Sequence, residues 1–506
     1  MGADGTSETG TTTIARWRDG KASAVTLAFD DSLWSHVDYV IPLLARNGLV
    51  GSFWVNPATS RYGYGIEMWE GGAQALGMEM CAHTMNHTGA SSYDEAEWEI
   101  GESARIVRAV NPPGAGKPFL FLRGGATTWK IPNDQIAAIV QKYGLVRGRG
   151  GGVDHGGDGK TGRELVGFVK EAEADGGIHC IAFHGVGSHA EWLTATAEAF
   201  EELAAYLRRN RDRVWNGTCG EVFKYVHERD SARVTVVASS GDEIRLDLSC
   251  ADDPGYYDAP LTLETRVPKE WKRCLVTQRG GECVRRASDG VVRYGALPNS
   301  GQIVLTGTAR RETPAPARPP APARRKIAWV GNPLLAVDRI GPGEPVAREL
   351  PPGLKDVCIG FTFRLTRDFS LPEYAKGGGN ALSLLAVSDE SGRELAAVRV
   401  YRHGKELSLY ALLQDNVDWQ GLPGWPEIDS GHLGLKAGRD HSVMLRLRAG
   451  CRDGGAELWL DGRLVCSFMR RDTTGRAAKG IVAGVSGRPE GMKGSIAVGE
   501  LRVTGE

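Results

Sequence analysis

The chain has 506 residues, of which 41% are hydrophobic and 24% are charged, and its formal net charge is −1, from 61 basic and 62 acidic residues. This length predicts two to four domains of ordinary globular composition. The balanced charge argues against a nucleic-acid partner, and no apolar run reaches the ~18 residues that a membrane-spanning helix needs.

Nine cysteines are scattered along the chain without a Cys-x-x-Cys pair. This spacing is not typical of a disulfide scaffold and excludes a four-cysteine zinc site. Disulfides and reduced, buried thiols are both open for Cys250, Cys274, Cys283, Cys451 and Cys466. The polar start has no signal-peptide pattern and is typical of a chain behind a removed leader, so we expect a secreted, periplasmic or cell-surface protein.

Residues 14–230 alternate short apolar runs with longer amphipathic stretches. The predicted strands cover 24–29, 48–55, 78–82, 119–122 and 178–183, and the predicted helices include 36–47, 93–110 and 191–209. Strands that alternate with helices indicate a parallel sheet with helices outside it, either doubly wound or rolled into a barrel.

The rest of the chain is dominated by strand patterns. Residues 231–308 show short alternating runs between Gly, Asp and Pro turns, which predict a small β-sandwich. Residues 309–326 contain five prolines and predict a semi-rigid linker. Residues 327–506 are again strand-rich, and Leu-Trp-Leu-Asp-Gly-Arg at 458–463 resembles the laminin-G and concanavalin-like β-sandwiches. This resemblance implies a separate β-sandwich domain.

Polar side chains follow the predicted parallel strands where each strand ends. Asp30 and Asp31 follow the first strand, His83 follows the third, Arg123 follows the fourth, and His184 follows the fifth. Because the carboxyl ends of parallel strands meet at one edge, where ligands and catalytic groups collect, we expect these side chains to share a site.

The residue types at this edge are those of a metal site. His83 and His87 are four residues apart, which predicts that both imidazoles lie on one helical face. Zinc and related cations accept imidazole nitrogen and carboxylate oxygen, and a catalytic site keeps a position open for water. Two adjacent aspartates repel each other unless one binds a cation and the other pairs with Arg123. The alternative is that Asp30 and Asp31 only cap the following helix.

Four motifs occur in a fixed order: LAFDDS (27–32), HTMNHT (83–88), FLRGG (121–125) and AFHGVG (182–187). Together they resemble the NodB-homology polysaccharide deacetylases, which are carbohydrate esterase family four, over about residues 20–230. The resemblance implies a distorted (β/α) barrel, usually with seven strands. It also implies a metal-dependent hydrolase that removes N-acetyl or O-acetyl groups from a polysaccharide or oligosaccharide.

The motif match assigns roles residue by residue. The implied ligands of a divalent metal, usually Zn²⁺, are Asp31, His83 and His87. The implied general base is Asp30, oriented by Arg123, and the implied general acid is His184. The metal and a backbone N–H near Gly125 or Ala126 would stabilise the oxyanion.

Two departures from the family pattern concern the third and fourth motifs. The third motif lacks its usual Pro and aromatic residue after Arg123, and Trp129 is a candidate for the missing aromatic. The fourth motif, Asp followed by Trp, has no counterpart, so Asp154 and Asp158 are the candidates to partner His184.

Sugar rings present apolar faces that stack on aromatic side chains. The candidate sugar-binding aromatics are Trp34, Trp69, Trp129, Trp419 and Trp425. Packing inside the protein is the alternative for each of them.

Two hypotheses about function remain. The first is a metal-dependent polysaccharide deacetylase, and the second is a catalytically impaired glycan-binding or adhesion protein on the same barrel. The enzyme is favoured because a barrel that only binds glycan needs neither Asp30 nor His184.

Overall fold

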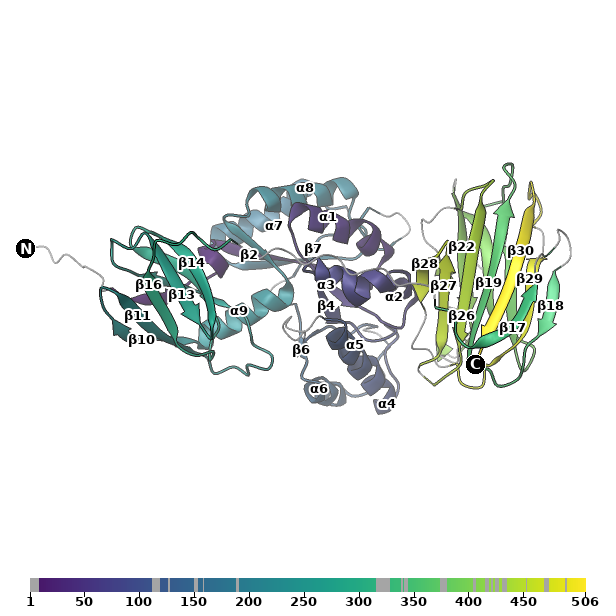
Figure 1. Cartoon of the computed structure of the whole chain (residues 1–506), viewed down its shortest axis with the longest axis horizontal. Helices are drawn as coiled ribbons and strands as arrows, with labels where there is room; N and C mark the ends of the chain where they lie inside the picture. Colours follow the sequence, from purple (N-terminus) through teal and green to yellow (C-terminus); the bar gives the residue numbers. More distant parts are fainter. Residues whose placement is uncertain are drawn as a thin grey trace, which may run out of the picture.

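The computed structural model describes residues 9–314 except 112–118, 126–127, 150–152, 158 and 188–190, and residues 328–506 except 338–339, 341–344, 374–379, 404–405, 415–417, 420–421, 424–426, 430–434, 452, 468–472 and 487–488. Figure 1 shows three parts along the long axis of the molecule: an antiparallel β-domain, an α/β domain in the middle and a β-sandwich.

The α/β domain is built on parallel strands in a sheet that curls into half of a barrel. The strand order is β6 (Val146–Arg147), β5 (Leu120–Phe121), β4 (Glu79–Ala82), β3 (Ser52–Val55), β2 (Ser23–Asp30), β8 (Ile178–Phe183) and β7 (Val153–His155), and β9 (Val214–Gly217) pairs with the first half of β2. All eight residues of β2 are buried. This is expected for a central strand of a parallel sheet that is covered on both faces.

Helices connect these strands. They are α1 (Ile41–Asn47), α2 (Ser60–Tyr64), α3 (Ala73–Ala75), α4 (Tyr93–Glu97), α5 (Ser103–Ala109), α6 (Asn133–Lys142), α7 (Gly162–Asp175), α8 (Ala197–Arg209) and α9 (Cys219–Ser231), with π-helical turns at His36–Val40, Met68–Gly72 and Trp98–Glu102. In α8, Phe200, Leu203 and Leu207 are buried at three- and four-residue spacing, and the Thr196 hydroxyl caps the helix by accepting from the Ala199 N–H at 3.1 Å.

Most of the elements predicted for this domain are confirmed, but two begin later than predicted. The strand predicted at 48–55 begins at Ser52, because Gly48 ends α1 with a left-handed φ of 72° and the chain turns there. The helix predicted at 191–209 begins at Ala197, because Ala195 pairs with Val186 in an isolated bridge that holds the preceding residues in a loop.

The β-domain is one eight-stranded antiparallel sheet around its own core. Its strands are β1 (Thr12–Ile14), β12 (Leu261–Arg266), β15 (Val291–Ala296), β14 (Gly281–Ser288), β13 (Arg273–Gln278), β16 (Ile303–Gly307), β11 (Glu243–Ser249) and β10 (Arg233–Ser239), in that order. Strand β1 comes from the start of the chain and pairs with β12, so this domain is not formed by residues 231–308 alone. Trp17, Trp215 and Tyr225 extend its core into the α/β domain.

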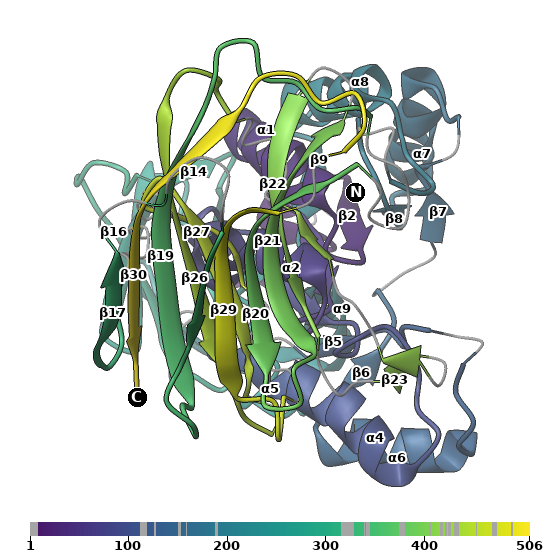
Figure 2. The ribbon, with the colours of Figure 1, turned by 90° about the vertical axis from the view of Figure 1, so that its right-hand side faces the viewer.

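The C-terminal part is a sandwich of two six-stranded antiparallel sheets. The first sheet is β17 (Asn332–Val337), β30 (Ile496–Gly505), β19 (Asp356–Leu365), β26 (Asp440–Arg448), β27 (Gly455–Leu460) and β28 (Arg463–Ser467). The second is β18 (Val346–Glu349), β29 (Ala478–Ser486), β20 (Leu382–Asp389), β21 (Glu394–His403), β22 (Glu406–Leu413) and β25 (Glu427–Asp429), and β23 (Asp418–Trp419) pairs with β24 (Leu422–Pro423) outside both sheets. Figure 2 shows the two sheets facing each other. Most of the predicted linker lies outside the described residues.

The sandwich packs on the α/β domain through strands of both of its sheets. Strand β28 of the first sheet and strand β25 of the second both lie against α2, and β28 and α2 are neighbours in Figure 1. Trp459 and Leu464 belong to the same buried apolar cluster as the core of the α/β domain. The two domains are therefore joined by an apolar contact and not only by the chain between them.

Eight of the nine cysteines are described with their side chains, and all eight are free thiols. The side chain of Cys466 lies outside the described part of the chain. None of the helices in the described part is both long and apolar enough to cross a membrane.

Leu203→Ala should lower the free energy of unfolding of the α/β domain by about 2–5 kcal/mol, because Leu203 is completely buried and its removal leaves a cavity. Denaturant titration followed by tryptophan fluorescence measures this change. Arg208→Ala, at an exposed position of the same helix, is the matched control. Equal stability of the two variants would contradict the assigned core.

Candidate active site

The two aspartates that follow the central strand are held in different directions by a strained turn. Asp30 is the last residue of β2, whereas Asp31 and Ser32 have left-handed φ values of 75° and 54°. Such values cost about 1–3 kcal/mol for residues other than glycine, and they concentrate at functional sites. Strand β3 supports the turn: the Asp31 N–H donates to the Trp54 carbonyl at 3.1 Å, and the Asn56 N–H donates to the Ser32 hydroxyl at 2.8 Å.

The two histidines lie on a loop, not on one helical face, so that prediction is wrong. Residues 83–90 follow β4 without helical structure, and Thr84 and His87 have left-handed φ values of 69° and 64°. The His87 N–H donates to the Thr84 hydroxyl at 3.2 Å. These two backbone reversals turn His87 back toward His83.

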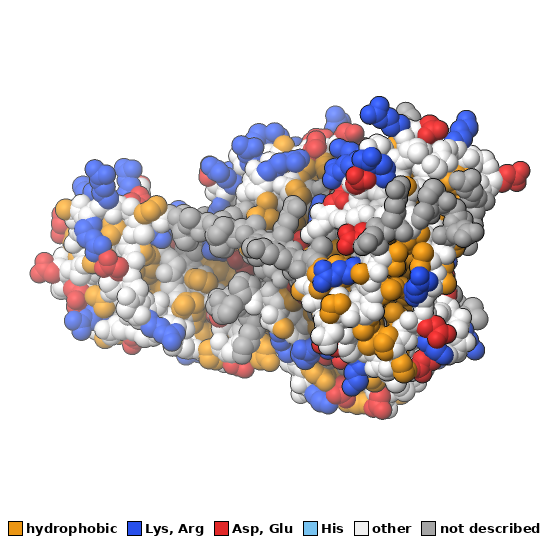
Figure 3. All heavy atoms as spheres, turned by 45° about the vertical axis from the view of Figure 1, so that its right-hand side comes forward, with side chains coloured by type: hydrophobic (Ala, Val, Ile, Leu, Met, Phe, Trp, Pro, Cys, Tyr) orange, Lys and Arg blue, Asp and Glu red, His pale blue; other side chains and the backbone are white. Residues whose placement is uncertain are grey.

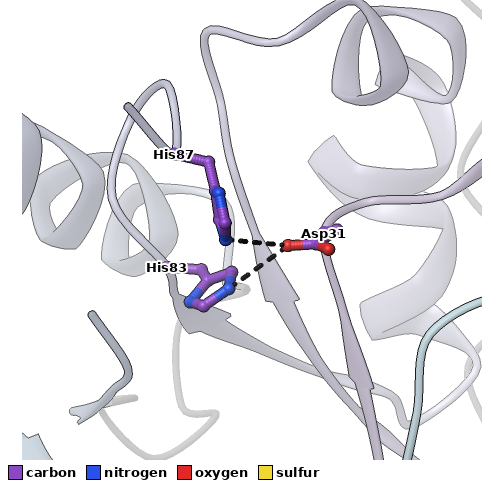
Figure 4. Close-up of side chains that lie close together, drawn as sticks. All are labelled: Asp31, His83 and His87. Carbon is purple, nitrogen blue, oxygen red and sulfur yellow. Dashed lines mark ion pairs between the residues drawn. The ribbon is translucent and has the colours of Figure 1, made fainter. Parts of the chain in front are cut away.

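Asp31, His83 and His87 converge on one point (Figure 4). The Nε2 atoms of His83 and His87 lie 3.3 Å and 3.2 Å from Asp31 Oδ1, and the three ligand atoms lie within 4.8 Å of one another. Asp31 Oδ1 is buried and has no hydrogen-bond donor in the described structure. A buried carboxylate oxygen that faces two imidazole nitrogens fits a divalent cation.

The tautomer of His83 also fits a metal ligand. His83 Nδ1 lies 3.0 Å from the Leu122 carbonyl, and a carbonyl only accepts, so Nδ1 carries the proton and Nε2 presents its lone pair to the site. Gly125 N–H donates to His87 Nε2 at 3.4 Å, so this nitrogen also acts as an acceptor. Gly125, which the resemblance suggested for the oxyanion, thus contacts a histidine, and Ala126 lies outside the described residues.

The charges at the site shift the pKa values of these three groups. Burial alone would raise the pKa of Asp31, but the neighbouring imidazoles of His83 and His87 lower it below its usual range. Burial would lower the pKa of His83, but Asp31 and Asp30 raise it overall. Burial dominates at His87 and lowers its pKa.

Asp30 is paired with Arg149, a residue that the sequence did not identify. An Arg149 Nη2 contacts Asp30 Oδ2, both side chains are largely buried, and the guanidinium lies 5.2 Å from the centre of the Trp54 ring. Arg123, expected to orient Asp30, instead donates to Asn133 Oδ1 at 3.2 Å and lies 6.0 Å from the Trp129 ring. Arg149 was missed because it stands in a glycine-rich stretch that resembles a flexible loop.

His184 lies beside both carboxylates. Its Nε2 is 4.0 Å from Asp30 Oδ2 and 3.8 Å from Asp31 Oδ2. Its backbone carbonyl accepts from Nε2 of His36, whose pKa burial lowers to about 4, so that this buried ring stays neutral. Asp154, one candidate partner of His184, contacts His179 Nδ1 at 2.8 Å, and the other candidate, Asp158, lies outside the described residues.

Trp192 is a second residue that the sequence did not identify. Its indole N–H donates to Asp31 Oδ2 at 3.0 Å, yet its side chain is 41% exposed. Arg61 lies 5.0 Å from the Trp192 ring and donates through Nε to the Asp31 carbonyl at 2.9 Å. Trp192 was placed in a predicted helix, whereas the chain forms a loop there that returns to the site. Its exposed ring lies next to the three candidate metal ligands Asp31, His83 and His87, which are called the metal-ligand set below.

The predicted sugar-binding aromatics lie in different environments. Trp69 is fully buried between Phe53 and Tyr62, so it packs the core and does not face a sugar. Trp34 and Trp129 are half-buried, and the Trp129 N–H donates to the Gly124 carbonyl at 2.7 Å. The Trp419 side chain and all of Trp425 lie outside the described residues.

The buried carboxylate of Glu99 anchors the loop that carries His83 and His87. Glu99 accepts from the Asn86 N–H at 2.9 Å and from the Thr88 hydroxyl at 3.4 Å. Burial raises the pKa of Glu99 to about 7, although these hydrogen bonds act in the opposite direction. Glu99 therefore ties the loop to the π-helical turn at Trp98–Glu102.

No family model matches the chain. The gellan lyase of a Bacillus species is 23% identical over 334 residues, which is 58% of this chain and 13% of that protein, so the chain spans about an eighth of that relative. A family 4 carbohydrate esterase from Streptomyces lividans, solved in complex with acetate, is 18% identical over 39% of this chain and 93% of its own, with a TM-score of 0.26. A peptidoglycan deacetylase from Bacillus subtilis is 17% identical over 40% of this chain and 89% of its own, also with a TM-score of 0.26. Because these TM-scores are low, the function has to be argued from the geometry of the site itself.

Between about pH 5 and pH 7 the wild type should lose stability relative to Glu99→Gln. In the unfolded chain Glu99 releases its proton above its ordinary pKa of 4.5, whereas in the folded chain it keeps the proton up to about 7, so the unfolded state is favoured as the pH rises. The relative loss should approach about 3 kcal/mol.

Denaturant titrations of both proteins in the presence of chelator, at steps of pH, measure this difference. Asp134→Asn, at an exposed position of α6, is the control that should follow the wild type. A difference between wild type and Glu99→Gln that stays constant over this range would contradict the raised pKa.

Proposed function

We propose that the α/β domain is a divalent-metal-dependent deacetylase that acts on an acetylated polysaccharide. The observation that carries this proposal is the convergence of Asp31, His83 and His87 beside a second, separately held carboxylate, Asp30. A metal site that served only structure would have no use for the second carboxylate. Zn²⁺ is the ion we propose, because two imidazoles and one carboxylate are a common catalytic ligand set for it.

When it is bound, the cation would activate water and polarise the acetyl carbonyl. Side chains of the protein would transfer the protons and hold the reacting groups in place. Asp30 takes a proton from the water that attacks the carbonyl carbon, and Arg149 holds the Asp30 carboxylate in place. His184 gives a proton to the nitrogen or oxygen that leaves, so the C–N or C–O bond breaks with release of acetate. Trp192 and Arg61 keep Asp31 in position.

The gellan lyase that is similar to this chain over 334 residues is named for a polysaccharide. This supports a polysaccharide, and not a small acetylated metabolite, as the substrate. Because the substrate is a polymer, we also propose that the protein acts outside the cytoplasm.

Arg149 is proposed to take the orienting role that the family pattern gives to Arg123. This also bears on the competing hypothesis of an impaired, glycan-binding barrel. Although Arg123 lies elsewhere, Arg149 pairs with Asp30, and this favours the enzyme.

Purified protein should release acetate from at least one member of a panel of N- and O-acetylated glycans. Chelator should abolish the release, added Zn²⁺ should restore it, and Asp30→Asn should lower kcat by about a hundredfold or more. Asp134→Asn is the matched control and should keep full activity. Protein without bound metal would contradict the assignment of Asp31, His83 and His87, and a metal-loaded protein without activity on the whole panel would favour the glycan-binding hypothesis.

Arg149→Met should lower kcat by about ten- to a hundredfold with a smaller effect on KM, because it removes the partner of the base and not a contact to the bound glycan. Arg149→Lys should restore part of this loss, since it returns a cation. Steady-state acetate release by these two variants and by Arg123→Met measures the comparison. A larger loss of kcat in Arg123→Met than in Arg149→Met would overturn the proposed exchange of roles.

A further inference from the structure

The outer face of the first sheet of the sandwich carries a hollow of about 180 Å³. Trp329, Gly360, Thr362, Ser442, Glu500 and Arg502 line it. It is separate from the metal-ligand set and is built on other elements. Figure 3 shows hydrophobic side chains gathered on the sandwich with basic side chains among them.

The register of three strands explains the floor of the hollow. Ile359, Phe361 and Phe363 of β19 point into the core of the sandwich, so Gly360 and Thr362 between them point outward. Gly360 is paired with Arg502 of β30 and with Met444 of β26, and Thr362 is paired with Ser442. Because Gly360, Thr362 and Ser442 have small side chains, the surface of the sheet is recessed at this point.

The walls of the hollow are an aromatic ring and charged groups. Trp329 is 37% exposed, and a Cβ atom on Gly360 would lie 2.4 Å from its Cη2 atom, so the ring rests on the glycine. The Arg502 guanidinium lies 4.5 Å from the centre of this ring. A β-bulge in the pairing of β19 with β30 adds Glu500 to the rim.

We propose that this hollow is a carbohydrate-binding subsite that takes one pyranose residue of a polysaccharide. The apolar face of the sugar stacks on Trp329, and its hydroxyl groups bond to Arg502, Glu500 and Ser442. Donors, acceptors and one exposed ring together match a sugar better than an apolar partner, which would bury the two charged groups without hydrogen bonds.

The hollow lies close to the contact between the sandwich and the α/β domain. Arg502, Gly360, Met444 and Trp459 form one row across four neighbouring strands, and Trp459 belongs to the apolar cluster shared with that domain. Gly360 and Trp459 are two strands apart, which is roughly 10 Å. A polysaccharide held in the hollow is thus bound beside the proposed deacetylase domain.

Binding is measured by calorimetry on the full chain carrying Asp30→Asn, with an N-acetylglucosamine hexasaccharide, O-acetylated xylan and gellan as probes. At least one probe should bind, and adding Trp329→Ala should weaken its binding by about tenfold or more. Tyr93→Ala, which removes an exposed aromatic from α4, is the matched control and should leave the affinity unchanged. Binding of none of the three probes, or wild-type affinity in Trp329→Ala, overturns the proposal.

A second variant distinguishes the loss of the subsite from a general loss of folding in Trp329→Ala. Ser442→Trp fills the hollow from an exposed position without removing a core side chain, and it should weaken binding as Trp329→Ala does. Unchanged affinity in Ser442→Trp would also overturn the proposal.

The test separates this subsite from the deacetylase. Acetate release from a short acetylated oligosaccharide, measured with the wild type and with Tyr93→Ala in the otherwise unchanged chain, reports on the deacetylase without depending on the hollow. Loss of glycan affinity without any acetate release in the wild type would refute the deacetylase and support the subsite. Full acetate release with no effect of Trp329→Ala on affinity would support the deacetylase and refute the subsite.

Discussion

Asp30 ends the central strand and Asp31 begins a left-handed turn, so two adjacent carboxylates point to different partners. Asp31 faces His83 and His87, and Asp30 faces Arg149. This separation eases the electrostatic problem of two neighbouring negative charges, because Arg149 compensates the charge of Asp30 and a bound cation would compensate that of Asp31. It is also what the different chemical roles proposed for the two aspartates require.

The turn persists because the surrounding structure fixes it from several sides. The Trp54 carbonyl of β3 accepts from the Asp31 N–H, and the Asn56 N–H, just after β3, donates to the Ser32 hydroxyl. Arg61 donates to the Asp31 carbonyl, and the Trp192 indole donates to Asp31 Oδ2. The opposing loop is strained in the same way, with left-handed residues at Thr84 and His87, and Glu99 anchors it. Strain on both sides of the metal-ligand set is thus held by the fold and is consistent with a site arranged before the ligand binds.

The sequence predicted which residues gather at one edge of the sheet better than it predicted their mutual arrangement. Strand ends place Asp30, Asp31, His83 and His184 at one edge, because parallel strands share a carboxyl edge, and this part follows from a pattern of a few residues. The orientation of the histidines did not follow, because four-residue spacing fits a helix as well as a loop with two reversals. The pairing of Asp30 with Arg149 joins residues 119 positions apart, and no local pattern encodes such a contact.

By itself, the sequence determined the alternation of strands and helices, the change to antiparallel β-structure and the residue types available for chemistry, because these depend on hydrophobic period and local turn preferences. Only the tertiary structure decided that Trp69 is a core residue and Trp192 faces the site, since burial depends on what packs against a side chain. The same holds for β1, which joins a sheet formed more than two hundred residues later, and for the hollow beside Trp329, whose floor exists only when β19, β26 and β30 lie in register. Contacts between distant segments are selected by packing and by the pairing of buried polar groups, and these act on the folded chain as a whole.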